Sequence, residues 1–299
     1  MGSWTAATLK ALHHPSLKDR VVIITGGGRG FGWLIAEELL KAGAKVALTA
    51  SRHPEELADV KTQAEAIAGP GRCITLRADV TKWEDCVATV DATVQAFGKV
   101  DVLINNAGRG TMEYALGGTT DSPGKRPKFY EIPAESFRTI VETNLIGVFN
   151  MSKAMVPVFL KQGRGKMFAI STSLNTMCSP GMSPYGASKV GLELTHRTWA
   201  GELKEHNIDV NILLPGGASD TPFITQGMVA GEVGKRAGQP GSTLLPGDVI
   251  VPPAVWLCTD ESNGMTGERI IAKFWPEGVE PKEAIKKCLQ PHTDLPQIM

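Results

Sequence analysis

Short apolar runs alternate with longer amphipathic stretches along most of this chain, and no other feature restricts its fold as much. Six runs have the length and composition of buried strands: Val21–Thr25, Lys45–Thr49, Cys73–Arg77, Val100–Ile104, Lys166–Ile170 and Asp209–Leu214. Arg269–Ala272 is a seventh candidate. The stretches between them are typical of surface helices: Phe31–Lys41, Pro54–Ile67, Trp83–Phe97, Ala134–Gln162 and Tyr185–His206. This order predicts an α/β fold with a doubly wound parallel sheet, in which crossover helices join successive strands.

The sequence shows no boundary that would divide the chain into two domains. Its 299 residues are 42% hydrophobic, enough to bury a substantial core, and neither a Pro/Gly/Ser linker nor an internal repeat occurs. We therefore expect a single domain over residues 18–272. Three segments lie outside the alternating pattern: an N-terminal arm at 1–17, a Gly- and Pro-bearing insertion at 109–131, and a C-terminal tail at 273–299 that is loose or packed on a neighbour.

The charge balance and the hydropathy argue against two classes of partner. Lys and Arg total 31 and Asp and Glu total 31, so the net charge gives no reason to expect nucleic acid or an anionic membrane. No stretch of about 18 apolar residues occurs, so no membrane span is predicted. The first residues also lack the continuous apolar stretch of a signal peptide.

The cysteines and histidines do not form a metal-binding pattern. The five cysteines are widely spaced without a Cys-x-x-Cys pair, which argues against a zinc site or a redox dithiol. H-E-x-x-H is absent and the six histidines are scattered, so no metal site is predicted. An odd number of separated cysteines is typical of reduced thiols, and we expect a cytoplasmic protein.

A glycine-rich turn follows the first strand, in the segment Thr25-Gly26-Gly27-Gly28-Arg29-Gly30-Phe31-Gly32. A nucleotide pyrophosphate requires close approach of the backbone and free amides at the start of a helix, and glycines permit both. The pattern is T-G-x-x-x-G-x-G, because Phe31 stands where G-x-G-x-x-G would have its last glycine. The alternative is a tight turn that only packs the helix against the strand.

Further motifs follow at the positions where the other strands end. Asn105-Asn106-Ala107-Gly108 follows the fourth strand, Pro215-Gly216 closes the sixth, and Tyr185-Gly186-Ala187-Ser188-Lys189 begins a helix. Asn144 lies in Thr143-Asn144-Leu145. Together with the glycine turn, these motifs resemble the short-chain dehydrogenase/reductase family from about Leu17 to Ala272. The resemblance implies a Rossmann-type fold, a nicotinamide cofactor, a small-molecule carbonyl or alcohol substrate, and a homodimer or homotetramer.

The resemblance also assigns residues to the cofactor. The glycine turn contributes Gly26, Arg29, Gly30, Phe31 and Gly32. The segments after the later strands contribute Asp79, Val80, Asn106, Ala107, Gly108, Pro215, Gly216 and Thr221. Residues 221–245 lie where the family's substrate lid lies. Their apolar side chains either line the substrate pocket or pack the lid shut: Phe223, Ile224, Met228 and Val229.

Tyr185 and Lys189 are the predicted catalytic pair. They are four residues apart, so they share one helical face, and the ammonium lowers the pKa of a tyrosine that must act as acid/base. The resemblance implies that Lys189 also holds the nicotinamide ribose and that Asn144 positions a water in the proton relay. The alternative is that Tyr185 only packs the start of its helix.

The family pattern also requires a hydroxyl residue thirteen positions before the tyrosine, which binds the substrate oxygen. This position is Thr172, within Ser171-Thr172-Ser173, where the usual residue is serine. Ser173 is the alternative, although neighbours on a strand face opposite ways. A third interpretation is that all three hydroxyls only satisfy the backbone at the strand end.

The end of the second strand predicts which nicotinamide cofactor is bound. NAD enzymes of this fold carry an acid there that binds the ribose hydroxyls, and this chain has Ala50. Arg52 and Arg29 are able to pair with a 2′-phosphate, and Ser51 is able to donate a hydrogen bond to it. NADP(H) is therefore favoured over NAD(H), unless both arginines are ordinary surface residues.

These motifs predict an NADP(H)-dependent oxidoreductase that transfers a hydride between the nicotinamide and a carbonyl or alcohol carbon. Two alternatives use the same scaffold: an epimerase or dehydratase, and a redox sensor that binds NADP(H) without turnover. A serine hydrolase is disfavoured because no G-x-S-x-G occurs.

Thr266-Gly267-Glu268-Arg269 is not followed by the Asp-Gly-Gly that is frequent in the family, so oligomer contacts there are not predicted.

Overall fold

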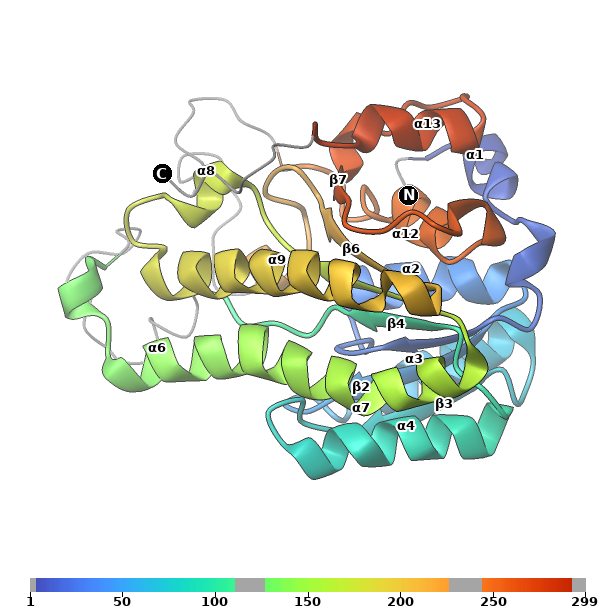
Figure 1. The fold of residues 1–299 in the computed structure, drawn as a ribbon, viewed down its shortest axis with the longest axis horizontal. Helices are drawn as coiled ribbons and strands as arrows, with labels where there is room; N and C mark the ends of the chain where they lie inside the picture. The colour runs from blue at the N-terminus through green and yellow to red at the C-terminus, as the bar shows by residue number, and fades with distance from the viewer. Residues whose placement is uncertain (1–3, 111–126, 226–243, 292–299) are drawn as a thin grey trace.

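A computed structural model of the chain describes residues 4–110, 127–225 and 244–291, arranged around a seven-stranded parallel sheet (Figure 1). The strand order is β3-β2-β1-β4-β5-β6-β7. The strands are β1 (Val21–Ile24), β2 (Lys45–Ala50), β3 (Cys73–Arg77), β4 (Val102–Asn105), β5 (Gly165–Ile170), β6 (Ile208–Leu214) and β7 (Arg269–Ile271). All seven predicted strands are confirmed, with bounds that differ by two residues or fewer.

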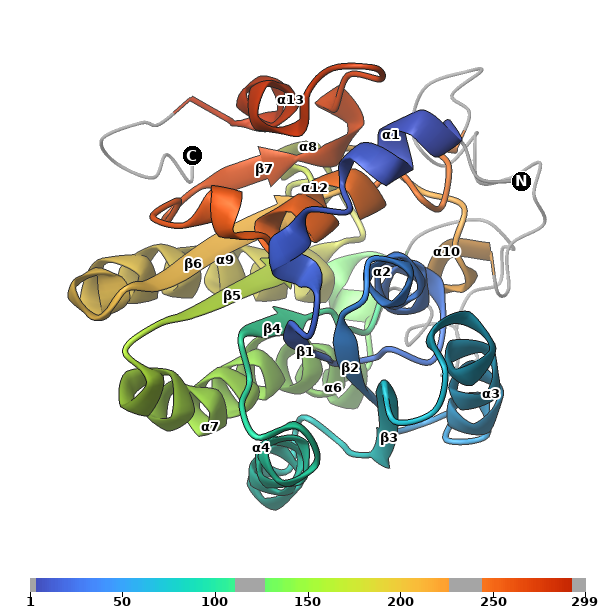
Figure 2. The same ribbon diagram turned by 90° about the vertical axis from the view of Figure 1, so that its right-hand side faces the viewer.

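Helices cover both faces of the sheet, because the central strands are apolar on both sides. On β1, Val22 and Ile24 are buried toward one face and Ile23 toward the other. The first face packs against α2 (Gly30–Lys41), α3 (Glu56–Ala68) and α12 (Val251–Leu257). The second face packs against α4 (Trp83–Phe97), α7 (Gly147–Gln162) and α9 (Ser183–Leu203). Figure 2 shows the two layers on opposite sides of the strands. The predicted doubly wound, single-domain Rossmann-type fold is confirmed.

The strand order predicts a ligand crevice beside β1. β1 pairs in parallel with β2 on one side and β4 on the other, so the chain reverses its direction of winding at this strand. Crossover connections leave in opposite directions from such a point, and the carboxyl ends of the two strands open a crevice there. The glycine turn after β1 and the Asn-Asn-Ala-Gly segment after β4 both lie at that edge.

The helix predicted over Ala134–Gln162 is interrupted in the structure. It consists of α6 (Ala134–Val141), a π-helical turn (Glu142–Ile146) and α7. A π-helical turn inserts an extra residue, which shifts the faces of the helix on either side, and such turns often occur at functional sites. Asn144 lies in this turn.

Residues 4–17 of the N-terminal arm and residues 273–291 of the C-terminal tail pack beside each other on the first face of the sheet (Figures 1 and 2). The arm contains α1 (Ala6–Ala11) and the tail contains α13 (Pro281–Cys288). The Thr5 amide donates to a Glu277 carboxylate oxygen at 3.0 Å. Ala284, Ile285 and Cys288 are buried in the core. Both segments are too short for helical periodicity to be recognised in the sequence.

Short helical segments complete the described chain. Two are α-helical, namely α8 (Leu174–Met177) and α10 (Pro222–Thr225). The others are 3-10 turns at Pro15–Leu17, Phe129–Glu131, Lys204–His206, Asp260–Ser262 and Ala272–Phe274. Within residues 4–110, 127–225 and 244–291, no helix combines the length and the apolar character needed to cross a membrane.

Candidate active site

The glycine turn packs closely against both its own helix and the segment after β4. A Cβ atom added at Gly32 would lie 2.3 Å from the carbonyl oxygen of Gly26, so only glycine permits α2 to approach the turn. Gly26 has φ +65° and would place a Cβ 3.0 Å from the Cα of Ala107. Helix α2 begins at Gly30, and the side chain of its N-cap residue, Arg29, makes no capping hydrogen bond. Free amides at the start of a helix, together with the helix dipole, are able to bind an anion such as a pyrophosphate.

Thr25 and Asn106 hold the two sides of the crevice together. The Asn106 side-chain amide donates to the carbonyl oxygens of Thr25 and Gly26, both at 2.9 Å. The Thr25 hydroxyl accepts from the amides of Asn106 and Ala107 at 3.1 and 3.0 Å. Thr25 was not among the predicted site residues, although the motif contains it. Its signal is a hydroxyl residue at the strand end directly before the glycines.

Lys189 is buried next to Tyr185 on α9. Its Nζ donates to the carbonyl oxygen of Ile170 at 2.7 Å and lies 5.8 Å from the centroid of the Tyr185 ring. Desolvation lowers the pKa of Lys189 to about 8, and the nearby Glu193 carboxylate acts in the opposite direction. The structure thus brings the predicted pair together, with a cation in a site of low polarity beside the phenol.

Asn144 is fully buried and both ends of its amide are bonded. Its Oδ1 accepts from the Arg109 amide at 2.7 Å, while its Nδ2 donates to the Arg109 carbonyl at 2.9 Å and to Ser188 Oγ at 3.1 Å. Ser188 Oγ in turn donates to the Tyr185 carbonyl at 2.7 Å. The π-helical turn therefore fixes the start of the 109–131 insertion and the first turn of α9 to one side chain. Residues 111–126 of that insertion lie outside the described part of the chain.

The three hydroxyl residues after β5 have different surroundings. Ser171 Oγ donates to Glu193 Oε1 at 2.5 Å. Ser173 is the N-cap of α8, where its Oγ accepts from the Thr176 amide at 3.2 Å. Thr172 is half-buried, and among the described residues its hydroxyl has no hydrogen-bond partner. Of the three, Thr172 is the residue whose hydroxyl is available to another molecule.

Arg269 connects this strand end with the tail of the chain. Its guanidinium donates to Glu193 Oε2 at 2.9 Å, to the Thr172 carbonyl at 2.8 Å and to Gln290 Oε1. Its own carbonyl accepts from the Gln290 amide at 2.9 Å. Neither Glu193 nor Arg269 was predicted as a site residue, because they lie far from Thr172 in the sequence.

The residues predicted to bind the adenosine part of the cofactor follow β1, β2 and β3. Ser51 and Arg52 follow β2, and Arg52 is exposed. Arg29 Nη1 lies 3.3 Å from Oε1 of Glu56, and Glu56 is the first residue of α3. The Asp79 carboxylate accepts from the amide and hydroxyl of Thr81 at 3.0 and 2.8 Å, so it is bonded within its own turn. Val80 is buried against Gly147.

The segment after β6 reaches over the glycine turn. Gly216 has φ +92°, and the Pro215 carbonyl accepts from the Lys273 amide at 3.1 Å. Thr221 is buried, and its Cβ would lie 3.8 Å from a Cβ added at Gly30. The Phe223 ring centroid lies 6.2 Å from that of Tyr185. The described part of the chain does not include residues 226–243, with Met228 and Val229, nor the side chain of Ile224.

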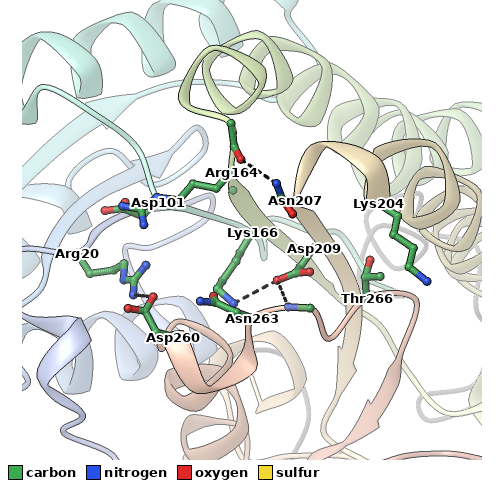
Figure 3. A pocket seen from close by; sticks show the side chains of 13 residues that line it. Arg20, Asp101, Arg164, Lys166, Lys204, Asn207, Asp209, Asp260, Asn263 and Thr266 are labelled. Carbon is green, nitrogen blue, oxygen red and sulfur yellow. Dashed lines mark hydrogen bonds and ion pairs between the residues drawn. The ribbon is translucent and has the colours of Figure 1, made fainter.

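A cavity of about 500 Å³ at the opposite edge of the sheet is a different kind of site (Figure 3). It lies where β5 and β6 begin, away from the glycine turn. Its acids pair with cations: Asp260 with Arg20, Asp209 with Lys166, and Asp101 with Lys99. This mutual pairing indicates a structural charge network. In the described part of the chain no cluster of side chains is suited to a metal ion.

Comparisons with known proteins agree with this geometry. The sequence profile of short chain dehydrogenases matches residues 20–227. The 3-oxoacyl-(acyl-carrier-protein) reductase of Thermotoga maritima is 29% identical over 260 residues, covering 85% of this chain and 96% of that protein.

Two solved structures have the same fold over most of their length. The 3-ketoacyl-(acyl-carrier-protein) reductase from Brucella melitensis, complexed with NADH, has a TM-score of 0.72 at 28% identity, covering 89% of this chain and 100% of that one. A short chain dehydrogenase from Burkholderia cenocepacia in complex with NADP has a TM-score of 0.71 at 25% identity, covering 85% and 96%. The chain therefore belongs to the short-chain dehydrogenase/reductase family of oxidoreductases.

Proposed function

We propose that this chain is an NADP(H)-dependent reductase or dehydrogenase in which Tyr185 is the general acid/base and Lys189 its cationic partner. One observation carries the proposal: the Lys189 ammonium is buried 5.8 Å from the Tyr185 ring centroid, with a pKa lowered to about 8 by desolvation. A positive charge in a site of low polarity stabilises a phenolate more than it would in water. Tyr185 is then able to exchange a proton at neutral pH.

The surrounding residues divide the other tasks of a carbonyl reduction. The bound nicotinamide supplies or accepts the hydride. The hydroxyl of Tyr185 donates the proton to the developing alkoxide, and the Thr172 hydroxyl binds the substrate oxygen. The Asn144 side chain holds the backbone of Arg109 at one side of the site and, through Ser188, the first turn of α9 at the other.

The choice of NADP(H) rests on Arg29, Arg52 and Ser51 at the adenosine side, together with the absence of an acid at Ala50. Of the two related structures, one was solved with NADH and the other with NADP. The substrate class is a small carbonyl compound or the corresponding alcohol. The names of the relatives favour a ketone, and the Phe223 ring beside Tyr185 favours an apolar substituent next to the reacting carbon.

Replacing Tyr185 by Phe tests the proposed acid/base. We expect loss of turnover, by about a hundredfold or more, with little change in the Kd for NADPH, because the hydroxyl acts in proton transfer and the affinity comes mainly from phosphate contacts. The measurement is NADPH oxidation with a panel of ketones and aldehydes, alongside direct binding of NADPH. Tyr130→Phe is the matched control, since Tyr130 is 65% exposed.

Two results would contradict the proposal in different ways. A Tyr185→Phe enzyme that keeps its kcat would show that another group transfers the proton. Wild-type protein that binds NADPH but turns over no carbonyl or alcohol substrate would favour the redox sensor, or an epimerase or dehydratase, over the oxidoreductase.

A further inference from the structure

We infer that Glu56 weakens the preference of this chain for NADP(H) over NAD(H). It supplies, from the start of α3, the carboxylate that the end of β2 lacks, and it competes with a 2′-phosphate for Arg29. The inference rests on the proposed function only in taking the glycine turn as the nicotinamide-cofactor site. It changes the expectation drawn from the sequence, which relied on the absence of an acid at Ala50.

The position of Glu56 is defined by its distance from the glycine turn. A Cβ atom added at Gly28 would lie 3.3 Å from Glu56 Cβ, 3.3 Å from Glu56 Oε2 and 3.7 Å from the Cβ of Ala50. The Glu56 carboxylate and the end of β2 therefore border the same point of the turn. NAD enzymes of this fold use an acid at this strand end to accept hydrogen bonds from the ribose.

The second carboxylate oxygen of Glu56 already has a cationic partner. Glu56 Oε1 lies 3.3 Å from Arg29 Nη1, and the two side chains are 26% and 29% exposed. Because the pair is partly desolvated, it is screened less than a fully exposed ion pair. A 2′-phosphate would have to share this guanidinium with Glu56 and would also be repelled by the carboxylate. A ribose with a free 2′-hydroxyl leaves the pair intact and faces an acceptor.

Glu55, the N-cap residue of α3, provides a comparison. It precedes Glu56 directly and has the same charge, but its carboxylate lies 3.2 Å from His53 Nδ1 and its side chain is 69% exposed. A general effect of negative charge at the start of α3 would therefore be removed equally by neutralising either residue. An effect that depends on the contact with Arg29 would be removed only at Glu56.

The experiment compares Glu56→Gln with the matched control Glu55→Gln in the full-length protein. The Kd values of NADPH, NADH and adenosine 2′,5′-bisphosphate are measured by titration at fixed ionic strength. We expect Glu56→Gln to shift the ratio of the Kd values toward NADPH by about tenfold and to tighten the bisphosphate, while Glu55→Gln shifts the ratio by less than about twofold. Thermal midpoints verify that each variant is folded.

A third variant tests whether Glu56 acts through Arg29. In an Arg29→Met background, we expect the effect of Glu56→Gln on the Kd ratio to shrink by at least about half. The competition for Arg29 is then absent, and only the repulsion between the Glu56 carboxylate and the 2′-phosphate remains. Equal changes in the two Kd values, or an unchanged effect without Arg29, would overturn the inference. If the wild-type protein prefers NADH while Glu56→Gln still shifts the ratio, the NADP(H) assignment fails and the inference about Glu56 stands.

Discussion

Thr172, Ser171 and Ser173 have the same functional group, but their surroundings give them different tasks. Ser171 is bonded to Glu193, and Ser173 caps α8. Of these three residues, only Thr172 has a hydroxyl without a hydrogen-bond partner in the described part of the chain. Thr172 follows β5 at the edge of the sheet where the glycine turn lies. Thr172 is therefore the best candidate for binding the substrate oxygen, because its hydroxyl makes no hydrogen bond that holds the fold together.

Replacing Thr172 by Ala is expected to lower kcat by about a hundredfold, since it removes a donor to the developing oxyanion. Ser173→Ala is expected to leave kcat nearly unchanged and to cost about 1 kcal/mol of stability, because it removes a helix cap. Steady-state kinetics with a ketone substrate and urea unfolding measure the two effects. The opposite pattern would show that Ser173 is the substrate-binding hydroxyl.

At the level of elements, the C-terminal segment is joined to the active-site edge through β7. Leu289 forms an antiparallel bridge with Ile270, and Gln290 bonds to Arg269 through both backbone and side chain. Arg269 also holds the Thr172 carbonyl and the Glu193 carboxylate. Since Glu193 raises the pKa of Lys189, this one guanidinium affects both the position of Thr172 and the charge around the lysine.

Arg269→Met is expected to lower kcat by about tenfold, because the strand end that carries Thr172 loses its anchor. It also leaves Glu193 without its cation, so the pKa of Lys189 rises and the alkaline limb of kcat/KM moves to higher pH. The check is a pH profile of carbonyl reduction, with Gln290→Ala as the control that removes only the side-chain hydrogen bond between Arg269 and the tail. A lower kcat with an unmoved alkaline limb would indicate a purely structural role.

For the whole molecule, burial of the charged Lys189 side chain lowers the free energy of unfolding. The pKa of Lys189 is about 8 in the folded chain and 10.5 in its unperturbed form, so the unfolded state holds this proton more tightly. Below pH 8 the folded state must bury the charge in full. As the pH rises from 8 toward 10.5, the folded chain releases the proton first and the penalty disappears.

Lys189→Met is therefore expected to abolish turnover and yet to raise the free energy of unfolding near neutral pH, by up to about 3 kcal/mol. The gain is expected to be largest at about pH 7 and small at about pH 10, where the wild-type lysine is uncharged in the folded state. Urea unfolding of both proteins at the two pH values measures the difference. A variant that is less stable than wild type at neutral pH would show that burial of the charged lysine does not destabilise the folded chain.

Residues close together in the sequence account for most of the architecture. The seven strands and the helices α2, α3, α4 and α9 follow from local runs of apolar residues and their periodicity, and the glycine turn follows from a strand end with small residues. Tyr185 and Lys189 share a face because they are one helical turn apart. The π-helical turn at Glu142–Ile146 was not predicted, because the apolar pattern continues across it.

Contacts between residues that are far apart in the chain were decided by tertiary packing alone. Glu56 reaches Gly28 and Arg29 because the start of α3 lies beside the glycine turn. Arg269 reaches Thr172 because β7 lies beyond β6. The pKa of Lys189 likewise depends on burial by several elements at once. Local propensity has a range of a few residues, whereas desolvation and charge pairing depend on distance in the folded chain.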